Sequence, residues 1–215
     1  YTAVFTPDSN GENYAELVAY VVPVISPAAG SVTAPTAKTD LVYNGAEQDL
    51  LATLPTSTTG EVQYSLDGTT YTAAAPKAKD AKAYTVWYKV VGDGNHEDVA
   101  AQSLPVTIAK KSITAPAEDT TAFTYTGEAQ TYALAENEAY TISGATQTKA
   151  NEAGYTVTVT LKDTENTKWA DGSTDAKTYT FVIAKKSIAA PAKDTTAFTY
   201  TGEAQTYTLA ENEAY

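Results

Sequence analysis

Apolar residues and threonines alternate along much of this chain. In "YTVTVTL" (155–161), the tyrosine, the valines and the leucine take every second position, and threonines take the positions between them. This period of two predicts an antiparallel strand with one face in a core and a threonine-rich face in water. The same pattern recurs over residues 84–90 and 179–183. We therefore expect an all-β chain.

Short turn sequences separate these runs. Asn-Gly or Asp-Gly pairs occur at 44–45, 67–68, 93–94 and 171–172, and such pairs are typical of tight turns between strands. The two most helix-like stretches, "AELVAY" and "ALAENEAY", are too short and lack capping residues. The pattern therefore predicts strands joined by turns.

The chain repeats itself. Ala109–Tyr140 and Ala184–Tyr215 differ only at the pairs 114/189, 118/193 and 133/208, and a more divergent copy begins near Val32. The exchange of Glu118 for Lys193 predicts a solvent-exposed position. We expect the C-terminal part of one repeat (1–26), two complete repeats (27–110 and 111–186) and the N-terminal part of another (187–215).

Repeats of this length with several short strands predict tandem small Ig-like β-sandwich domains. The linkers between them are one or two residues long, which predicts an elongated rod. The main alternative is a set of β-grasp-like repeats, with a short helix in "LKDTENTKWADG" (161–172). The first repeat also carries an additional stretch, residues 54–71, that the second lacks.

Composition narrows the classes of partner. The 215 residues carry a net charge of −12 and contain neither Arg nor Cys. Nucleic-acid binding is not expected because phosphate contacts need a basic surface, and an anionic membrane surface would repel the chain. No apolar run approaches the roughly 18 residues that span a bilayer, so no direct membrane insertion is expected. Any targeting segment would lie outside this sequence.

A family resemblance rests on short motifs. The pattern Y-x-G-x-x-Q occurs at 43–48 and 125–130, and is followed in the second repeat by "AGYTVTVTLKD", "WADGSTD" and "TYTFVIAKK". This series resembles the tandem Ig-like repeats of large bacterial cell-surface proteins. "FTPDSNGENY" (5–14) resembles the related MBG-type surface repeats. The resemblance implies an extracellular or cell-surface location and a non-catalytic stalk or spacer in an adhesin-like protein.

Acidic turns are the candidate metal sites. Calcium takes six to eight oxygen ligands, which Asp, Asn and Glu side chains supply. The candidate ligands, at equivalent places in the two complete repeats, are Asp93, Asn95, Glu97, Asp163, Glu165 and Asp171, and Asp8, Glu12 and Asn13 take that place in the first part of the chain. The same residue types also stabilise ordinary tight turns. We expect no cofactor, with calcium as the alternative.

Two further residues have candidate roles. His96 is the only histidine, and the repeats supply no partners for a Ser-His-Asp or zinc site, so it is predicted to be a turn residue and no enzyme is expected. Trp87 is out of phase with the inward residues Val86 and Tyr88. It is therefore predicted to lie exposed or between domains, and is the preferred binding residue.

Three roles follow from these features. The first is a structural spacer whose partners are neighbouring repeats or copies of the same chain. The second is an adhesin module that recognises a host glycan or protein. The third is a filament subunit in which the partial repeats of two chains complete each other by strand complementation.

Overall fold

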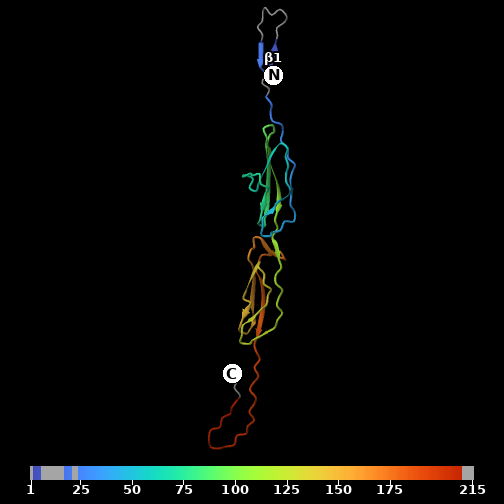
Figure 1. Cartoon of the computed structure of the whole chain (residues 1–215). Helices are drawn as coiled ribbons and strands as arrows, with labels where there is room; N and C mark the ends of the chain where they lie inside the picture. Colours follow the sequence, from blue (N-terminus) through green and yellow to red (C-terminus); the bar gives the residue numbers. More distant parts are fainter. Residues whose placement is uncertain (1, 6–16, 21–23, 210–215) are drawn as a thin grey trace, which may run out of the picture. The chain divides into compact units, whose positions relative to one another are not determined.

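The computed structural model describes residues 2–5, 17–20 and 24–209 (Figure 1). The regular structure of these residues consists of seventeen β-strands, with no helix among them. The prediction of an all-β chain is therefore confirmed. Within the same residues, no helix is long and apolar enough to cross a membrane.

The chain divides into two compact units, Tyr1–Lys111 and Ser112–Tyr215. The division falls one residue beyond the boundary that the repeats predict. Each unit has its own buried clusters of apolar side chains, and no described residue belongs to the clusters of both. In unit 1, an antiparallel hairpin of β1 (Thr2–Phe5) and β2 (Leu17–Tyr20) precedes the first complete repeat.

The complete repeat of unit 1 contains a three-stranded antiparallel sheet in the order β6-β8-β9. Two short antiparallel ladders, β3–β5 and β4–β7, accompany it. Their side chains share one core with the sheet. The bounds are β3 (Thr36–Ala37), β4 (Gln48–Asp49), β5 (Leu51–Thr53), β6 (Gly60–Ser65), β7 (Lys77–Ala78), β8 (Ala83–Gly92) and β9 (Val99–Thr107).

Unit 2 contains a four-stranded sheet in the order β11-β17-β15-β13 and the two-stranded ladders β12–β14 and β10–β16. Its core forms two clusters that both contact Leu134, Ile142 and Tyr179. The bounds are β10 (Lys111–Ile113), β11 (Phe123–Thr124), β12 (Gln130–Thr131), β13 (Tyr140–Ser143), β14 (Thr146–Gln147), β15 (Asn151–Leu161), β16 (Thr167–Trp169) and β17 (Lys177–Ala184).

The alternating pattern identifies the core-facing side chains. In β15, Val157, Val159 and Leu161 are buried, and the threonines between them are not. In β8, Val86 and Val90 are completely buried. The period-two prediction is therefore confirmed in both units. The exchanged pair at 118 and 193 is exposed at both positions, also as expected.

Tyrosines at the ends of this pattern are half-buried. The hydroxyl of Tyr84 donates to the carbonyl of Asp80 at 2.8 Å, and that of Tyr155 donates to the carbonyl of Lys149 at 2.9 Å. Each ring therefore covers the core while its polar end bonds to backbone near the surface. The sequence predicts these tyrosines as inward-facing, and the structure shows that only their rings are.

The segment that carries the β-grasp alternative contains no helix. Residues 161–172 form the end of β15, a turn, and β16. β16 carries Trp169, which is 1% exposed, packs against Tyr140 and donates its ring N–H to the carbonyl of Asp175 at 2.7 Å. The short polar run between β15 and β16 is therefore a turn, and it places Trp169 in the core. The helix that the β-grasp-like alternative expects over 161–172 is absent.

In both units a segment early in the repeat pairs in parallel with the end of the repeat. In unit 2, β11 pairs with β17, and the N–H of Tyr125 donates to the carbonyl of Ala184 at 2.8 Å. In unit 1, the N–H of Tyr43 donates to the carbonyl of Ala109 at 2.9 Å, beside a parallel bridge. We call this pairing the closing contact, because it joins an early segment of a complete repeat to the end of that repeat.

Two neighbouring residues of β17 test this packing. Ile183 is fully buried beside the closing contact, whereas Val182 is 41% exposed. Ile183→Ala should destabilise unit 2 by about 2–5 kcal/mol because it leaves a cavity in the core. The matched variant Val182→Ala should cost less than about 1 kcal/mol.

Urea denaturation followed by ¹⁹F NMR of fluorotryptophan-labelled protein separates the two units, because Trp87 lies in unit 1 and Trp169 in unit 2. The midpoint reported by Trp169 should fall in Ile183→Ala while that reported by Trp87 stays unchanged. Equal shifts at both tryptophans would contradict separate cores.

Candidate functional site

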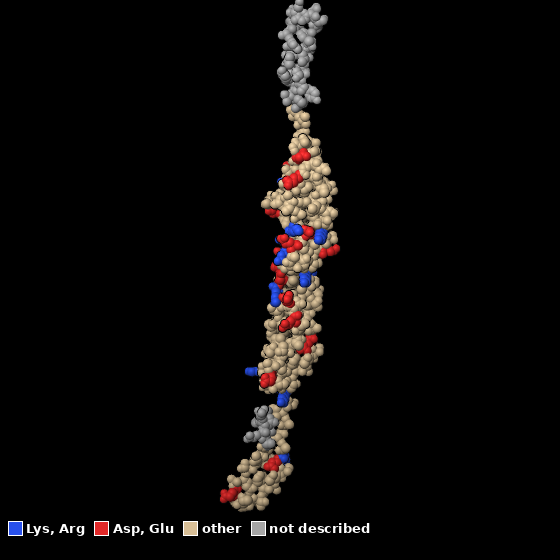
Figure 2. All heavy atoms as spheres, viewed as in Figure 1, with Lys and Arg blue, Asp and Glu red and all other residues tan. Residues whose placement is uncertain are grey.

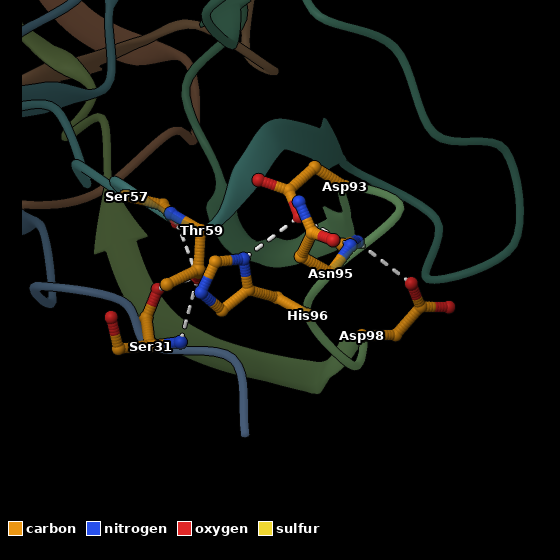
Figure 3. Close-up of polar contacts among 8 residues, drawn as sticks. Ser31, Ser57, Thr59, Asp93, Asn95, His96 and Asp98 are labelled. Carbon is orange, nitrogen blue, oxygen red and sulfur yellow. Dashed lines mark hydrogen bonds and ion pairs between the residues drawn. The ribbon is translucent and has the colours of Figure 1, made fainter. Parts of the chain in front are cut away.

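The polar candidates of unit 1 lie in the connection between β8 and β9 (Figure 3). Asp93 Oδ1 accepts hydrogen bonds from the N–H of Asn95 at 2.9 Å and from Nδ1 of His96 at 2.7 Å. The N–H of Asn95, and after it the His96 ring, lower the pKa of Asp93. The Asp93 side chain thus stabilises a turn of its own backbone.

This turn also holds the beginning of the repeat. The N–H of Ala28 donates to the carbonyl of Asn95, and the N–H of Glu97 donates to the carbonyl of Ala28, both at 2.8 Å. Close by in Figure 3, Thr59 Oγ1 accepts the N–H of Ser31 at 2.8 Å and donates to the carbonyl of Ser31 at 3.2 Å. These hydrogen bonds hold Ala28 against the connection between β8 and β9, and Ser31 against the loop that contains Thr59.

The arrangement differs from that of a hydrolytic triad. Such a site needs a serine hydroxyl hydrogen-bonded to the imidazole nitrogen that faces away from the aspartate. Here Ser57 Oγ lies 3.0 Å from Thr59 Oγ1 and accepts the N–H of Thr59 at 3.1 Å. Ser31 contributes backbone groups. This geometry gives His96 the hydrogen bonds of a turn residue.

In unit 2, Asp163 organises the turn that follows β15. Its Oδ1 accepts the N–H of Glu165 at 3.1 Å and the N–H of Asn166 at 3.0 Å. Its Oδ2 accepts Nδ2 of Asn166 at 2.9 Å. Glu165 contributes its backbone N–H to this network, as Glu97 does in unit 1. The two glutamates therefore take part through their backbone.

Asp171 organises the turn that follows β16. Its Oδ1 accepts the N–H and the hydroxyl of Ser173, at 3.0 and 2.9 Å, and its Oδ2 forms an ion pair with Nζ of Lys177. The hydrogen bond from Lys177, followed by those from Ser173, lowers the pKa of Asp171 to about 2. Gly172 has a φ of +90°, which favours glycine at this position.

The acidic turns do not assemble a cluster of acids. Among the residues that the structure describes, no group of three or more His, Asp or Glu side chains could hold a metal ion. The carboxylates of Asp93, Asp163 and Asp171 instead accept hydrogen bonds from their own turns. Asp8, Glu12 and Asn13 lie outside the described residues. Calcium binding at these turns stays a prediction.

Trp87 lies on the face of β8 opposite Val86 and is half-buried. A turn of the additional stretch lies against it, and a Cβ added to Gly68 would lie 3.2 Å from the Trp87 ring. Asp67 stabilises that turn, since its Oδ1 accepts the N–H groups of Thr69 and Thr70 at 2.7 and 2.8 Å. Trp87 thus leaves the core face, as its phase predicts, but it is partly covered by the stretch present only in the first repeat instead of lying exposed. Its role in binding stays a prediction.

The Y-x-G-x-x-Q motif has a structural role that sequence reasoning missed. In each copy the Gln side chain donates from Nε2 to a carbonyl six residues earlier. Gln48 donates to Val42 at 3.1 Å, Gln130 to Thr124 at 2.9 Å, and Gln205 to Thr199 at 2.6 Å. The intervening glycines have φ values of +82°, +90° and +78°. The recurrence of Gln at one spacing from Gly was the available signal.

Substitution of Asp171 tests whether its carboxylate stabilises the turn that follows β16. A carboxylate with a lowered folded-state pKa stabilises the folded state above its ordinary pKa near 3.9, and this stabilisation disappears as the pH falls towards about 2. Asp171→Asn should remove that pH dependence from unit 2. Lys177→Gln removes the main cause of the shift, so the pKa of Asp171 should rise towards its ordinary value.

NMR titration of the Asp171 side-chain carboxyl measures this pKa directly, and denaturation between pH 2 and pH 5 measures the stability of unit 2. An unchanged Asp171 titration in Lys177→Gln would contradict the assignment.

Metal removal tests the calcium alternative. Because the turn carboxylates accept hydrogen bonds from backbone and neighbouring side chains, both units should keep their folded structure without calcium. Excess EDTA, and separately millimolar CaCl₂, should leave the thermal transitions of both units unchanged. A transition that rises with calcium and is lost on Asp171→Asn or Asp93→Asn would establish a calcium site.

Comparison with known proteins assigns this chain to no family, because no family model, curated protein or solved structure matches it. The resemblance to bacterial surface repeats therefore stays an expectation from the motifs. The geometry of the two units, with separate cores and a closing contact in each, is the basis for a proposed function.

Proposed function

We propose that this chain belongs to the structural repeat region, a stalk or spacer, of a bacterial cell-surface or extracellular adhesin-like protein, and that it is non-catalytic. The observation that carries this proposal is the closing contact, which two consecutive repeats form with separate cores. A repeat that closes on itself can be duplicated without disturbing its neighbours. Length is the property that such duplication changes.

Within this proposal, each complete repeat is a small Ig-like β-sandwich. Two features support it: each complete repeat combines one main sheet with shorter ladders around its core, and an early segment pairs in parallel with the end of the repeat. The absence of a helix from residues 161–172 disfavours the β-grasp-like alternative.

The polar residues also support a structural role. In the described residues, every buried side-chain nitrogen or oxygen has a hydrogen-bond partner. Asp93, Asp163 and Asp171 hold their own turns. An active site usually concentrates strained or unsatisfied groups in a cleft, and these turns show the opposite arrangement. Their chemistry fits a scaffold that folds without disulfides, since the chain has no Cys.

The negative net charge argues against nucleic acids and anionic membranes as partners. The net charge is −12, and all cationic side chains are lysines. On the face drawn in Figure 2, lysines lie among acidic residues. Two ion pairs, Lys77–Asp49 and Lys177–Asp171, join such charges. A continuous basic surface is what nucleic acids and anionic membranes require. Other repeats, or copies of this chain, are therefore the expected partners.

Surface proteolysis tests the proposed location. Brief protease treatment of intact cells that produce this protein should release its peptides into the medium, because the repeats face the outside. A cytoplasmic protein followed in the same samples reports lysis. If the peptides appear only after the cytoplasmic marker does, the proposal of a surface spacer is wrong.

A binding assay separates a spacer from the adhesin alternative. The full chain should show no saturable binding to glycan or mucin arrays, and Trp87→Ala should behave like the wild type, because the Trp87 ring packs on the turn at Gly68. Saturable binding that Trp87→Ala abolishes, with the fold retained by circular dichroism, would instead establish an adhesin site.

A further inference from the structure

The Y-x-G-x-x-Q turn of unit 1 contains an asparagine followed by a glycine, Asn44-Gly45. The chain has a second such pair at 10–11, which lies outside the described residues. Asn44 and Gly45 are both exposed, and a Cβ added to Gly45 would meet nothing within 4 Å. The other two copies of the turn carry Thr126 and Thr201 in place of the asparagine. Of the two complete repeats, only the first therefore has an Asn-Gly pair open to water in this turn.

An Asn-Gly pair can react within its own backbone. The nitrogen of the residue after an asparagine can attack the side-chain carbon Cγ and close a five-membered succinimide ring. A side chain on that following residue crowds the nitrogen and restricts the backbone, whereas glycine does neither. Gly45 has a φ of +82°, a conformation that favours glycine, so the turn keeps the residue that leaves the nitrogen most accessible.

A hydrogen bond prepares the Asn44 side chain for this attack. The N–H of Ala46 donates to Oδ1 of Asn44 at 2.9 Å. Attack at Cγ places negative charge on that oxygen, and an N–H that already points at it stabilises the charge. Asn137 and Asn151 accept the N–H two residues further along in the same way, at 2.9 and 3.0 Å, but each is followed by Glu. They are internal controls that share the hydrogen bond and differ in the next residue.

Asn44 lies at the closing contact of unit 1. The N–H of the preceding residue, Tyr43, donates to the carbonyl of Ala109 at 2.9 Å. Across the turn, Nε2 of Gln48 donates to the carbonyl of Val42 at 3.1 Å. The length of main chain between residues 42 and 48 must satisfy both bonds. A change of that length at residue 44 therefore disturbs the closing contact.

We propose that Asn44 is a self-modification site, at which deamidation loosens the closing contact of unit 1. The nitrogen of Gly45 forms a bond to Cγ of Asn44, the bond from Cγ to the side-chain nitrogen breaks, and ammonia leaves with the proton of the Gly45 N–H. Water then opens the succinimide. Addition at Cγ gives aspartate, and addition at the main-chain carbonyl gives isoaspartate. The net reaction converts an amide and water into a carboxylic acid and ammonia, without oxidation or reduction.

The isoaspartate product changes the main chain itself. It routes the chain through Cγ, which adds a methylene between Tyr43 and Gly45, so the bonds of Tyr43 and Gln48 no longer fit together. Thr126, at the equivalent place in unit 2, has no carbonyl in its side chain and cannot form a succinimide. The reaction therefore weakens one complete repeat with time and spares the other. This self-modification goes beyond the proposed spacer role and is independent of it.

Peptide mapping of the aged protein tests the chemistry. The full chain is incubated in warm, mildly alkaline buffer, and its tryptic peptide Thr39–Lys77 contains Asn44 as its only asparagine. Mass spectrometry should show this peptide gaining the mass difference between an amide and an acid, with fragment ions placing the change at Asn44. Resistance to a protease that cleaves before aspartate identifies the isoaspartate fraction. Asn137 and Asn151 should stay largely unconverted. An unconverted Asn44, or equal conversion of all three, would overturn the proposal.

The variant Asn44→Thr tests the effect on the closing contact. It introduces the residue found at position 126, whose Oγ1 accepts the N–H of Glu128 at 3.3 Å, so the turn keeps a bond of the same kind. Urea denaturation with ¹⁹F NMR is applied to samples of increasing age. In the wild type the midpoint reported by Trp87 should fall as isoaspartate accumulates, while that reported by Trp169 stays constant. In Asn44→Thr both midpoints should stay constant. A Trp87 midpoint that ignores the conversion, or that falls equally in Asn44→Thr, would overturn the proposal.

Discussion

The closing contact, the parallel pairing of an early segment of each complete repeat with its end, is the contact on which the rest of the structure depends. It joins segments that are far apart in sequence, as with Tyr43 and Ala109 in unit 1. Once the pairing forms, the rings of Phe123 and Tyr132 lie on Phe181, and the core of unit 2 has its aromatic layer. Their counterparts Phe198 and Tyr207, which have no such pairing among the described residues, are 50% and 48% exposed. The closing contact therefore buries aromatic side chains that the local turns by themselves leave exposed.

The acidic residues stabilise the turns of this fold, because their carboxylates accept hydrogen bonds from nearby backbone N–H groups. Asp67, Asp93, Asp163 and Asp171 each accept a backbone N–H from the residue two positions further along the chain. Such bonds form within a few residues and need no tertiary partner. They fix where strands begin and end, and they leave the carboxylates at the surface, where they keep the chain strongly anionic. A scaffold built in this way tolerates exchanges such as Glu118 for Lys193 on its exposed positions.

The two units differ where the first carries its additional stretch. That stretch supplies β6 and the turn at Gly68, and the turn packs on Trp87. Periodicity placed Trp87 on the outer face of β8 but gave no sign of a turn folding back over it, because that contact joins residues distant in sequence. Trp169 is the opposite case. The β-grasp-like alternative placed it in a short helix, and only the packing against Tyr140 shows it to be a core residue of a strand.

The sequence by itself determined the strands and the turns of this protein. Alternation of threonine with valine, leucine or isoleucine sets which face of a strand is apolar, and glycine with a nearby Gln sets the Y-x-G-x-x-Q turn. All three copies of that turn form, including the copy at the C-terminus. Only the tertiary structure decided burial. Phe123–Tyr132 and Phe198–Tyr207 are the same ten residues with the same turn, yet one ends in a core tyrosine and the other in an exposed one. The physical reason is that a turn is stabilised by neighbours in the chain, whereas a core exists only when a distant strand arrives to cover it.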